Sequence, residues 1–433
     1  MIVGADWLIT GVGAPTRRGG VYCHASQVVE VGTFDDLVAA HPAQPAEYFA
    51  DCIITPGLVN AHTHLSLTVL QGLTPRGEFA PWLGTVTRAV LAMGHDDFAA
   101  SASLGAIESL QCGVTAVGDI VYGPEALAAT ADAGVAGAFF WEVLGIDAAD
   151  LSGELADSEF PTGRGSCTTG RTRCGISPHA PYSSGPQLLQ ATHTIAAAHG
   201  VGYAVHVAES LAESELTRHG AGPFAPIARR LAPDFTTPRR SPVAYLDSLG
   251  VLDDALAIHC VQVDADDIRL LKQKTRGVAL CPRSNEYLGN GHPPVSELYA
   301  AGVTIALGTD SAASNADLDL MNEVRAIRRL GPAITSRRLL RMVTTDGARA
   351  LGLGDTLGSL EPGKQADVAV FRIAATADPE TAVVKKAGRD TLAAVITAGS
   401  WRVRDSRPCF PTGAADRAGA RAREVAQRAI DAV

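Results

Sequence analysis

Eight short apolar runs alternate with longer Ala- and Leu-rich stretches along the middle of the chain. The stretches, such as Phe98–Cys112 and Pro186–His199, carry apolar residues at helical spacing. The apolar runs predict eight buried strands: Leu58–His62, Thr115–Ile120, Ala138–Val143, Arg173–Ser177, Tyr203–Val207, Ala255–His259, Val278–Cys281 and Thr304–Gly308. Strands that alternate with helices favour a parallel sheet.

Two architectures contain parallel strands in this order. A doubly wound open sheet usually carries a glycine-rich phosphate-binding turn after its first strand. Here the first run ends in His62-Thr63-His64 instead. We therefore predict an α/β fold in which residues 56–355 form a (β/α)8 barrel. The active site of such a barrel lies at the carboxyl ends of the strands.

The two flanks of the chain have a different pattern. Residues 1–55 and 356–433 contain turn residues and short alternating runs, namely Gln27–Val31, Asp367–Phe371 and Ala393–Thr397. Neither half alone could bury a sheet face, so we expect one small β-sandwich module built from both chain ends. Ala415–Val433 is rich in Ala and Arg and predicts an amphipathic helix that docks on the rest.

Composition excludes several classes of function. Of the 433 residues, 46% are hydrophobic, which is ample for a packed core. A net charge of -10 argues against nucleic acid as a partner. The chain has neither a run of 18 apolar residues nor a basic start followed by an apolar stretch. We therefore expect no membrane contact, no signal peptide and a cytoplasmic location.

Four side chains at strand ends predict a metal site. His62 and His64 are two residues apart on a strand, so both imidazoles face the same side. His206 ends the fifth predicted strand and Asp310 follows the eighth. Three nitrogens and one oxygen on one rim leave a position for water, as in catalytic rather than structural metal sites. The donor types suit Zn²⁺ or Fe²⁺.

Three more titratable residues are expected at the same rim. Glu209 follows His206 closely and could carry a proton, or it could be a solvated glutamate at a helix start. His259 ends the sixth strand, where a buried histidine bonded to backbone is the alternative. His179 ends the fourth strand and could contact substrate, or be a turn residue between two prolines.

Other hydrolase signatures are absent from the sequence. There is no HExxH, no GxSxG and no P-loop. The H-x-E … P-C-x-x-C pattern of the zinc cytidine deaminases is also missing. If this chain is a deaminase, its fold therefore differs from that of the zinc cytidine deaminases.

Five segments in one order resemble the amidohydrolase superfamily, in particular its mononuclear aminohydrolases. They are PGLVNAHTHLS, HVAES, IHCVQV, CPRSN and LGTDSAASN. A later segment, GSLEPGKQAD, resembles the one that returns the chain of that family to its β-module. The resemblance covers nearly the whole chain. It implies a metal-dependent hydrolase that acts on C–N bonds of cyclic amidines and releases ammonia.

The resemblance also implies roles for individual residues. The implied metal ligands are His62, His64, His206 and Asp310. Glu209 is implied to protonate a ring nitrogen, and His259 and Asp310 to manage the proton of the water. His179 is the implied substrate contact.

The distribution of lysine bears on the number of metal ions. Some relatives hold two metals bridged by a carboxylated lysine near strand four. This chain has five lysines, and the first is Lys272. Strands one to six therefore cannot supply the bridge. We expect one divalent ion, zinc or alternatively iron, unless an Asp, Glu or Cys replaces the lysine.

The substrate is inferred from the segment after the first strand. Its F-x-x-W-L element resembles the compact lid of the aminodeoxyfutalosine deaminases of menaquinone synthesis. Trp82 would cover a purine ring, although a core aromatic is the alternative. Ser284 and Asn285 offer polar groups to a ribose. We therefore expect an N6-amino purine nucleoside derivative, with aminodeoxyfutalosine as the first candidate.

Several alternatives stay open at this point. Adenosine, S-adenosylhomocysteine and methylthioadenosine are the nearest alternative substrates, followed by guanine, a pterin or a cyclic amide. A non-catalytic barrel is disfavoured because every expected ligand is present. Homodimers are common for this fold, so a homodimer is left open beside the small-molecule substrate.

Overall fold

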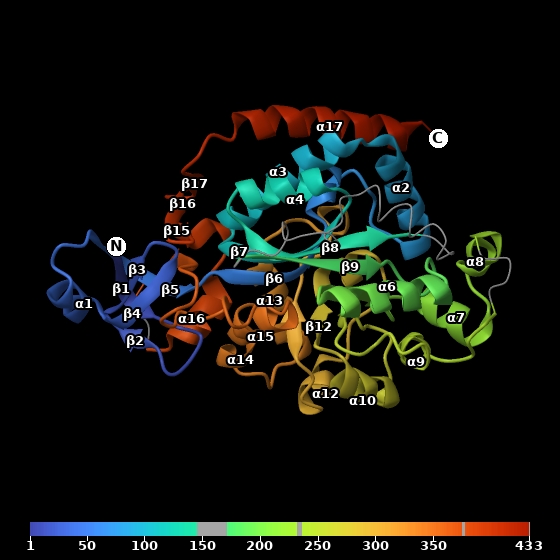
Figure 1. The fold of residues 1–433 in the computed structure, drawn as a ribbon, viewed down its shortest axis with the longest axis horizontal. Helices are drawn as coiled ribbons and strands as arrows, with labels where there is room; N and C mark the ends of the chain where they lie inside the picture. The colour runs from blue at the N-terminus through green and yellow to red at the C-terminus, as the bar shows by residue number, and fades with distance from the viewer. Residues whose placement is uncertain (145–170, 232–235, 375–376, 433) are drawn as a thin grey trace.

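The computed structural model describes residues 1–144, 171–231, 236–374 and 377–432 and contains two sheets. One is a parallel sheet of eight strands in the middle of the chain, and the other is a sheet of nine strands from its two ends (Figure 1). Within the described residues no helix is both long and apolar enough to cross a membrane.

The parallel sheet closes into a barrel. Its strands follow one another in sequence order: β6 (Leu58–Thr63), β7 (Val114–Val121), β8 (Ala136–Val143), β9 (Thr172–Pro178), β10 (Gly202–Val207), β11 (Leu256–His259), β12 (Gly277–Leu280) and β13 (Ile305–Leu307). The first and last strands meet where the Asp310 amide donates to the His62 carbonyl at 3.0 Å. The eight predicted strands and the predicted (β/α)8 barrel are confirmed.

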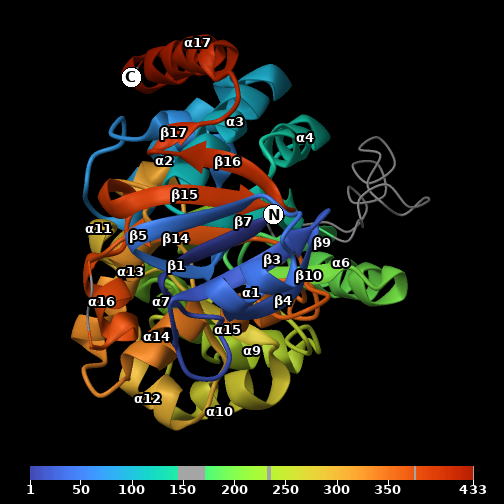
Figure 2. The same cartoon turned by 90° about the vertical axis from the view of Figure 1, so that its left-hand side faces the viewer.

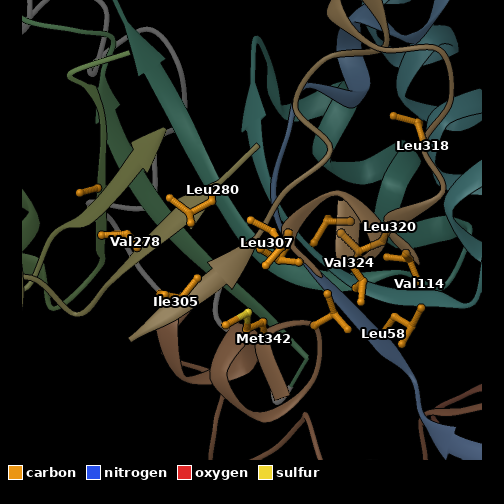
Figure 3. Packing of buried hydrophobic residues seen from close by; sticks show 14 of the residues in the cluster. Leu58, Val114, Val278, Leu280, Ile305, Leu307, Leu318, Leu320, Val324 and Met342 are labelled. Carbon is orange, nitrogen blue, oxygen red and sulfur yellow. The ribbon is translucent and has the colours of Figure 1, made fainter. Parts of the chain in front are cut away.

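Side chains alternate between the inside and the outside of this barrel. On β12, Val278 and Leu280 point outward to the helices, whereas Ala279 faces the barrel interior. Figure 3 shows the outward cluster, where Leu307 of β13 lies near Val324 of a surrounding helix and Ile305 lies near Met342. Because both faces of every strand are buried, the strands read as continuous apolar runs.

Helices cover the outside of the barrel and connect its strands. They are α3 (His95–Gln111), α4 (Pro124–Asp132), α6 (Pro186–His199), α7 (Leu211–His219), α8 (Ala225–Leu231), α9 (Pro242–Ser248), α10 (Ala265–Lys274), α11 (Pro282–Tyr287), α12 (Val295–Ala300), α13 (Leu320–Leu330) and α14 (Ser336–Met342). Two further elements follow β6 and approach the carboxyl ends of the strands, η1 (Leu65–Leu70) and α2 (Phe79–Ala92). Helix α15 (Thr345–Ala350) and the turn after it cover the other end, where Leu351, Leu353 and Leu357 fill the barrel floor.

The second sheet combines both ends of the chain, as expected, and is called the β-module below (Figure 2). Its N-terminal strands are β1 (Ile2–Leu8), β2 (Thr16–Arg17), β3 (Gly19–His24), β4 (Gln27–Thr33) and β5 (Ala46–Pro56), with α1 (Phe34–Ala40) beside them. Its C-terminal part consists of β14 (Val368–Arg372), β15 (Leu392–Thr397), β16 (Ser400–Arg404) and β17 (Arg407–Pro408), with α16 (Pro379–Lys386). Strand β14 pairs with β5, which joins the two halves. The sheet curls, so that Val28 of β4 and Ile396 of β15 share one buried cluster.

The last helix, α17 (Gly413–Asp431), lies along the outside of α3 and also contacts α2 and η1 (Figure 1). Its buried residues include Ala422 and Ala426, which give it a smooth face for close packing. Arg423 donates from Nη1 to the backbone carbonyls of Val69 and Gln71, at 2.7 and 2.8 Å. The terminal helix therefore holds the segment that follows the first barrel strand.

We predict that Arg423→Ala lowers the free energy of unfolding by about 1–3 kcal/mol, because two carbonyls lose a charged donor. Urea unfolding should show a lower midpoint with an unchanged m value. Arg421→Ala is the matched control, since Arg421 is exposed on the same helix. Equal midpoints for the two variants would contradict the anchoring role of Arg423.

Candidate metal centre and active site

The residues expected to bind a metal meet at the carboxyl ends of the barrel strands. His62 lies on β6, His64 just after it, His206 on β10 and Asp310 after β13. The Nε2 atoms of His62 and His64 lie 3.3 and 3.5 Å from Asp310 Oδ1. The rings of His62 and His206 have centroids 5.0 Å apart. One ligand atom each from His62, His64 and Asp310 lie within 4.8 Å of one another, and so do those of His62, His206 and His259.

Neighbouring groups fix the orientation of these side chains. The Nδ1 atom of His206 lies 2.8 Å from the backbone carbonyl of His179, which leaves its other nitrogen for the site. Asp310 accepts from the Ser311 amide at 2.7 Å through Oδ1 and from the Ser284 hydroxyl at 2.5 Å through Oδ2. This is the arrangement expected around a metal centre, whose ligands are themselves held by hydrogen bonds.

The donor set fits a divalent metal ion. Among the described residues, His62 Nε2 and His64 Nδ1 are buried without a hydrogen-bond partner. Burial and the neighbouring His62 lower the pKa of His64 to about 3, so its imidazole is neutral. Burial works against ionisation of Asp310, but the imidazoles around it, with His62 Nε2 3.3 Å from its Oδ1, hold its pKa well below the usual value. Neutral imidazoles and a carboxylate are the protonation states that bind zinc.

Glu209 and His259 form a second buried pair beside these ligands. The Oε2 atom of Glu209 lies 3.8 Å from His259 Nε2, and its Oε1 atom accepts from Asn290 Nδ2 at 3.1 Å. Glu209 is 3% exposed, so the alternative of a solvated glutamate at a helix start is excluded. Burial, Asp310 and Glu213 raise the pKa of Glu209 well above its usual value, although the bond from Asn290 opposes them. A carboxyl group with a raised pKa suits a proton donor.

His259 is held by both its backbone and its ring. Its φ of 75° lies in the left-handed region, which non-glycine residues seldom adopt, and Asp310 has φ 60°. The Nδ1 atom of His259 lies 3.1 Å from Asn285 Oδ1, and burial lowers the pKa of His259 to about 4. Unusual backbone conformations at two strand ends indicate that the fold aims these side chains into the site.

A cavity of about 60 Å³ adjoins the expected ligands. Its wall combines the polar side chains of His64, His206, Glu209, His259 and Asp310 with the apolar side chains of Phe79, Trp82, Leu83 and Val86 of α2. Trp82 is both buried in an apolar cluster and part of the cavity wall, and its Nε1 donates to the Ala313 carbonyl at 3.2 Å. His179 also lines the cavity, and its Nδ1 lies 2.6 Å from Ser183 Oγ.

Ser284 and Asn285 lie elsewhere than expected. Both are fully buried, and neither is part of the described cavity wall. Ser284 bonds to Asp310 and Asn285 to His259, so the structure places them behind the site. Their position reflects the helix α11, which begins directly after β12 and turns these side chains toward the neighbouring strand ends.

Sequence reasoning missed several residues at this rim. Glu142, near the end of β8, groups with His179 and His206, with one ligand atom of each within 4.8 Å. Burial raises the pKa of Glu142 to about 7. Glu142 is an acidic residue at the end of the third predicted strand, and this position could have identified it from the sequence. Tyr122 and Tyr182 also line the cavity, but isolated tyrosines carry no such signal.

Asp119 on β7 was also missed, and it supports the segment that carries His62 and His64. Its Oδ1 accepts from Thr63 Oγ1 at 2.7 Å and from the Leu65 amide at 2.8 Å. Its Oδ2 has no hydrogen-bond partner among the described residues. Burial raises the pKa of Asp119 to about 7, although the two hydrogen bonds oppose this.

We predict that Asp119→Asn changes the pH dependence of stability. Folded Asp119 keeps its proton up to about pH 7, whereas the unfolded chain releases it near pH 3.8. The native state therefore binds more protons between these values, so its stability falls as pH rises, by at most about 1.4 kcal/mol per pH unit. The free energy of unfolding should be measured at pH 5 and pH 8 with a chelator present to remove metal. It should fall less between these pH values for the variant than for the unchanged protein. An identical pH dependence would contradict this assignment.

A wider groove lies next to the small cavity. Its volume is about 880 Å³, and it shares Phe79 and Leu288 with the cavity wall. The Arg76 guanidinium lies over the Tyr287 ring, 5.1 Å from its centroid, and Tyr287 is held by a 2.5 Å hydrogen bond to the Thr74 carbonyl. Among the described residues no carboxylate lies within ion-pair distance of Arg76. An exposed cation without an ion-pair partner among the described residues therefore lies beside the site, in a groove that Glu78, Glu215 and Glu286 also line.

Known proteins share both the sequence and the fold. The sequence pattern of the amidohydrolase family matches residues 53–402. The 5-methylthioadenosine/S-adenosylhomocysteine deaminase of Moorella thermoacetica is 32% identical over 377 residues, 84% of this chain and 83% of that protein. The aminodeoxyfutalosine deaminase of Deinococcus radiodurans is 34% identical over 369 residues, 80% of this chain and 84% of that protein. The crystal structure of an adenosine deaminase from Xanthomonas campestris with bound zinc has a TM-score of 0.84 and 24% identity, and it covers 99% of this chain and 98% of that one.

Proposed function

The chain belongs to the amidohydrolase family, and on this premise we propose that it is a metal-dependent hydrolytic deaminase that releases ammonia from an N6-amino purine nucleoside derivative. The observation that carries the proposal is the rim of the barrel, where three histidines and an aspartate converge beside a buried carboxylic acid. The deaminase relatives, which match over most of their length, support the same reaction.

The proposed cofactor is one divalent ion, zinc with iron as the alternative. His62, His64, His206 and Asp310 would hold it. When bound, such an ion lowers the pKa of a coordinated water toward neutrality and so supplies hydroxide near pH 7. The zinc in the Xanthomonas campestris adenosine deaminase supports the choice of metal.

Two observations favour one ion over two. Strands β6 to β11 contain no lysine that could become a carboxylated bridge. The second group of ligands, Glu142, His179 and His206, shares His206 with the first, and His206 has only one ring nitrogen left. A single histidine nitrogen cannot complete both sites at once.

Different side chains of this protein carry out the different proton transfers of the reaction. Asp310 and His259 accept and hold the proton of the attacking water. Glu209 protonates the ring nitrogen next to the carbon that carries the amino group. Collapse of the tetrahedral carbon then requires a proton on the leaving amine, which departs as ammonia. Ser284 and Asn285 act as positioning residues for Asp310 and His259.

We predict that Glu209→Gln keeps its metal but loses about 10²- to 10⁴-fold in kcat, because the amide cannot deliver the proton. Metal content by plasma mass spectrometry and ammonia release should be measured on the same sample. Glu424→Gln, on the exposed face of α17, is the matched control and should keep full activity. Near-normal turnover of Glu209→Gln would remove Glu209 from the mechanism.

The groove bears on the choice of substrate. A nucleoside bound at the metal centre would extend into this space, past Arg76. Aminodeoxyfutalosine and S-adenosylhomocysteine carry a carboxylate on the ribose substituent, whereas adenosine and methylthioadenosine do not. Arg76 is the basic residue of this groove wall and has no ion-pair partner among the described residues, which favours a carboxylate-bearing substrate. We therefore propose aminodeoxyfutalosine first and S-adenosylhomocysteine second.

We predict that Arg76→Ala lowers kcat/KM by about tenfold or more for these two substrates and leaves methylthioadenosine within about twofold. Arg88→Ala, exposed on α2, is the control and should change none of them. Ammonia release from all four nucleosides measures the effect. An equal loss on every substrate would contradict the role of Arg76, and activity on guanine or a pterin alone would contradict the substrate class.

The proposal also covers organisation and partners. Residues 56–355 would form the catalytic barrel, and residues 1–55 and 356–433 the β-module with the terminal helix. The net charge of -10 supports a small-molecule substrate rather than nucleic acid. We place the enzyme in the cytoplasm and propose a homodimer, which light scattering would test.

A further inference from the structure

A second large pocket lies at the opposite end of the barrel from the metal centre. Its volume is about 670 Å³, and it is lined by the β-module, the start of β6, helices α14 and α15, and the segment after α15. Figure 1 shows α14 and α15 next to the β-module. Leu58 lines this pocket, and His62 lies four residues further along the same strand. At about 3.3 Å per residue the two sites are separated by about 13 Å of strand.

The wall of this pocket has more basic than acidic side chains. Its five basic residues are Arg173, Arg337, Arg341, Arg349 and Lys364, and its three acidic residues are Asp355, Glu361 and Glu380. The surplus is unusual in a chain whose net charge is -10. The surplus of basic side chains therefore needs an explanation within the pocket itself.

One buried carboxylate lies within ion-pair distance of three guanidinium groups at this wall. Asp346, whose side chain is 1% exposed, lies 3.0 Å from Arg338, 3.2 Å from Arg341 and 3.4 Å from Arg349. A single negative charge cannot neutralise three positive ones. Among the described residues, Arg341 Nε is buried without a hydrogen-bond partner. The cluster therefore keeps an uncompensated positive charge that faces the pocket.

Arg173 adds a further cation without a carboxylate partner. Its Nη1 donates to the Gly352 carbonyl at 2.5 Å, and no described carboxylate pairs with it. By contrast, Arg337 pairs with Glu380 at 2.8 Å, and Lys364 lies 3.6 Å from Glu361. The uncompensated charge is thus concentrated on Arg173, Arg341 and Arg349.

The remaining wall can hold an organic group. Ile9, Leu340 and Leu357 contribute apolar surface. Gly11, Gly13 and Gly352 have φ between 69° and 84°, a conformation that suits glycine and brings the backbone close to a ligand. Guanidinium groups pair with phosphate through two parallel hydrogen bonds, and backbone next to glycine accommodates it closely.

We propose that this pocket binds a phosphate-bearing small molecule, with the phosphate on Arg173, Arg341 and Arg349 and an organic group against Ile9 and Leu340. The pocket touches both the β-module and the barrel floor, so the ligand bridges these two parts of the fold. This site does not depend on the metal centre or on the deaminase reaction.

Isothermal titration calorimetry on the metal-loaded enzyme, in phosphate-free buffer, tests the proposal with ribose 5-phosphate and inorganic phosphate. We expect saturable binding of about one ribose 5-phosphate per chain, which weakens as salt rises. Arg349→Ala and Arg173→Gln should each raise the Kd about tenfold or more. Two other arginines remain on Asp346 when Arg349 is removed, so that variant keeps the local fold. Arg269→Ala, an exposed arginine on α10, is the matched control.

Each outcome decides the proposal. Tighter binding of ribose 5-phosphate than of phosphate supports the proposed organic phosphate, whereas equal binding would overturn the organic group and leave free phosphate as the ligand. Unchanged binding after chelation of the metal places the ligand away from the active site. Absence of saturable binding by both probes would overturn the proposal. So would an unchanged Kd in both variants, or loss of binding on chelation.

Discussion

Closure of the barrel between its first and last strands is the interaction on which the rest of the structure depends. Asn60 and Thr309 exchange two hydrogen bonds, of 2.8 and 3.0 Å, and the Asp310 amide donates to the His62 carbonyl. These bonds join residues about 250 positions apart in the chain. They bring the Asp310 carboxylate to His62 on the first strand and to His64 just after it. Without closure, the carboxylate and the imidazoles of the proposed metal site would lie at opposite edges of an open sheet.

Burial then sets the protonation state of each group at the rim. The same loss of water lowers the pKa of His64 to about 3 and of His259 to about 4, and raises the pKa of Glu209 well above its usual value. Asp310 stays ionised, because the surrounding imidazoles outweigh its burial. The rim therefore combines neutral His64 and His259 with a low pKa at Asp310 and a raised pKa at Glu209. A deaminase needs this division, since the reaction must both accept and deliver protons.

The sequence predicted the features that repeat along the chain and the features that lie within a single strand. Apolar runs located all eight strands, and the strand-end rule found His62, His206, His259 and Asp310 because parallel strands share one carboxyl edge. Ser284 and Asn285 lie behind Asp310 and His259 and outside the described cavity wall, since strand order does not tell which way a side chain turns at the start of a helix. Asp119 was missed for a related reason, because its partners are Thr63 on the neighbouring strand and Leu65 at the start of η1. The arginine cluster around Asp346 likewise depends on tertiary contacts that spacing alone does not reveal.

The central claim is that one divalent ion lies between His62, His64, His206 and Asp310. Anomalous diffraction from a crystal of the metal-loaded enzyme, collected at the zinc edge, tests it most directly. We expect one peak per chain, at about 2.0–2.2 Å from three histidine nitrogens and one aspartate oxygen. A peak on Glu142 and His179 instead, two peaks bridged by a carboxylate, or no peak in a crystal of active enzyme would contradict the account.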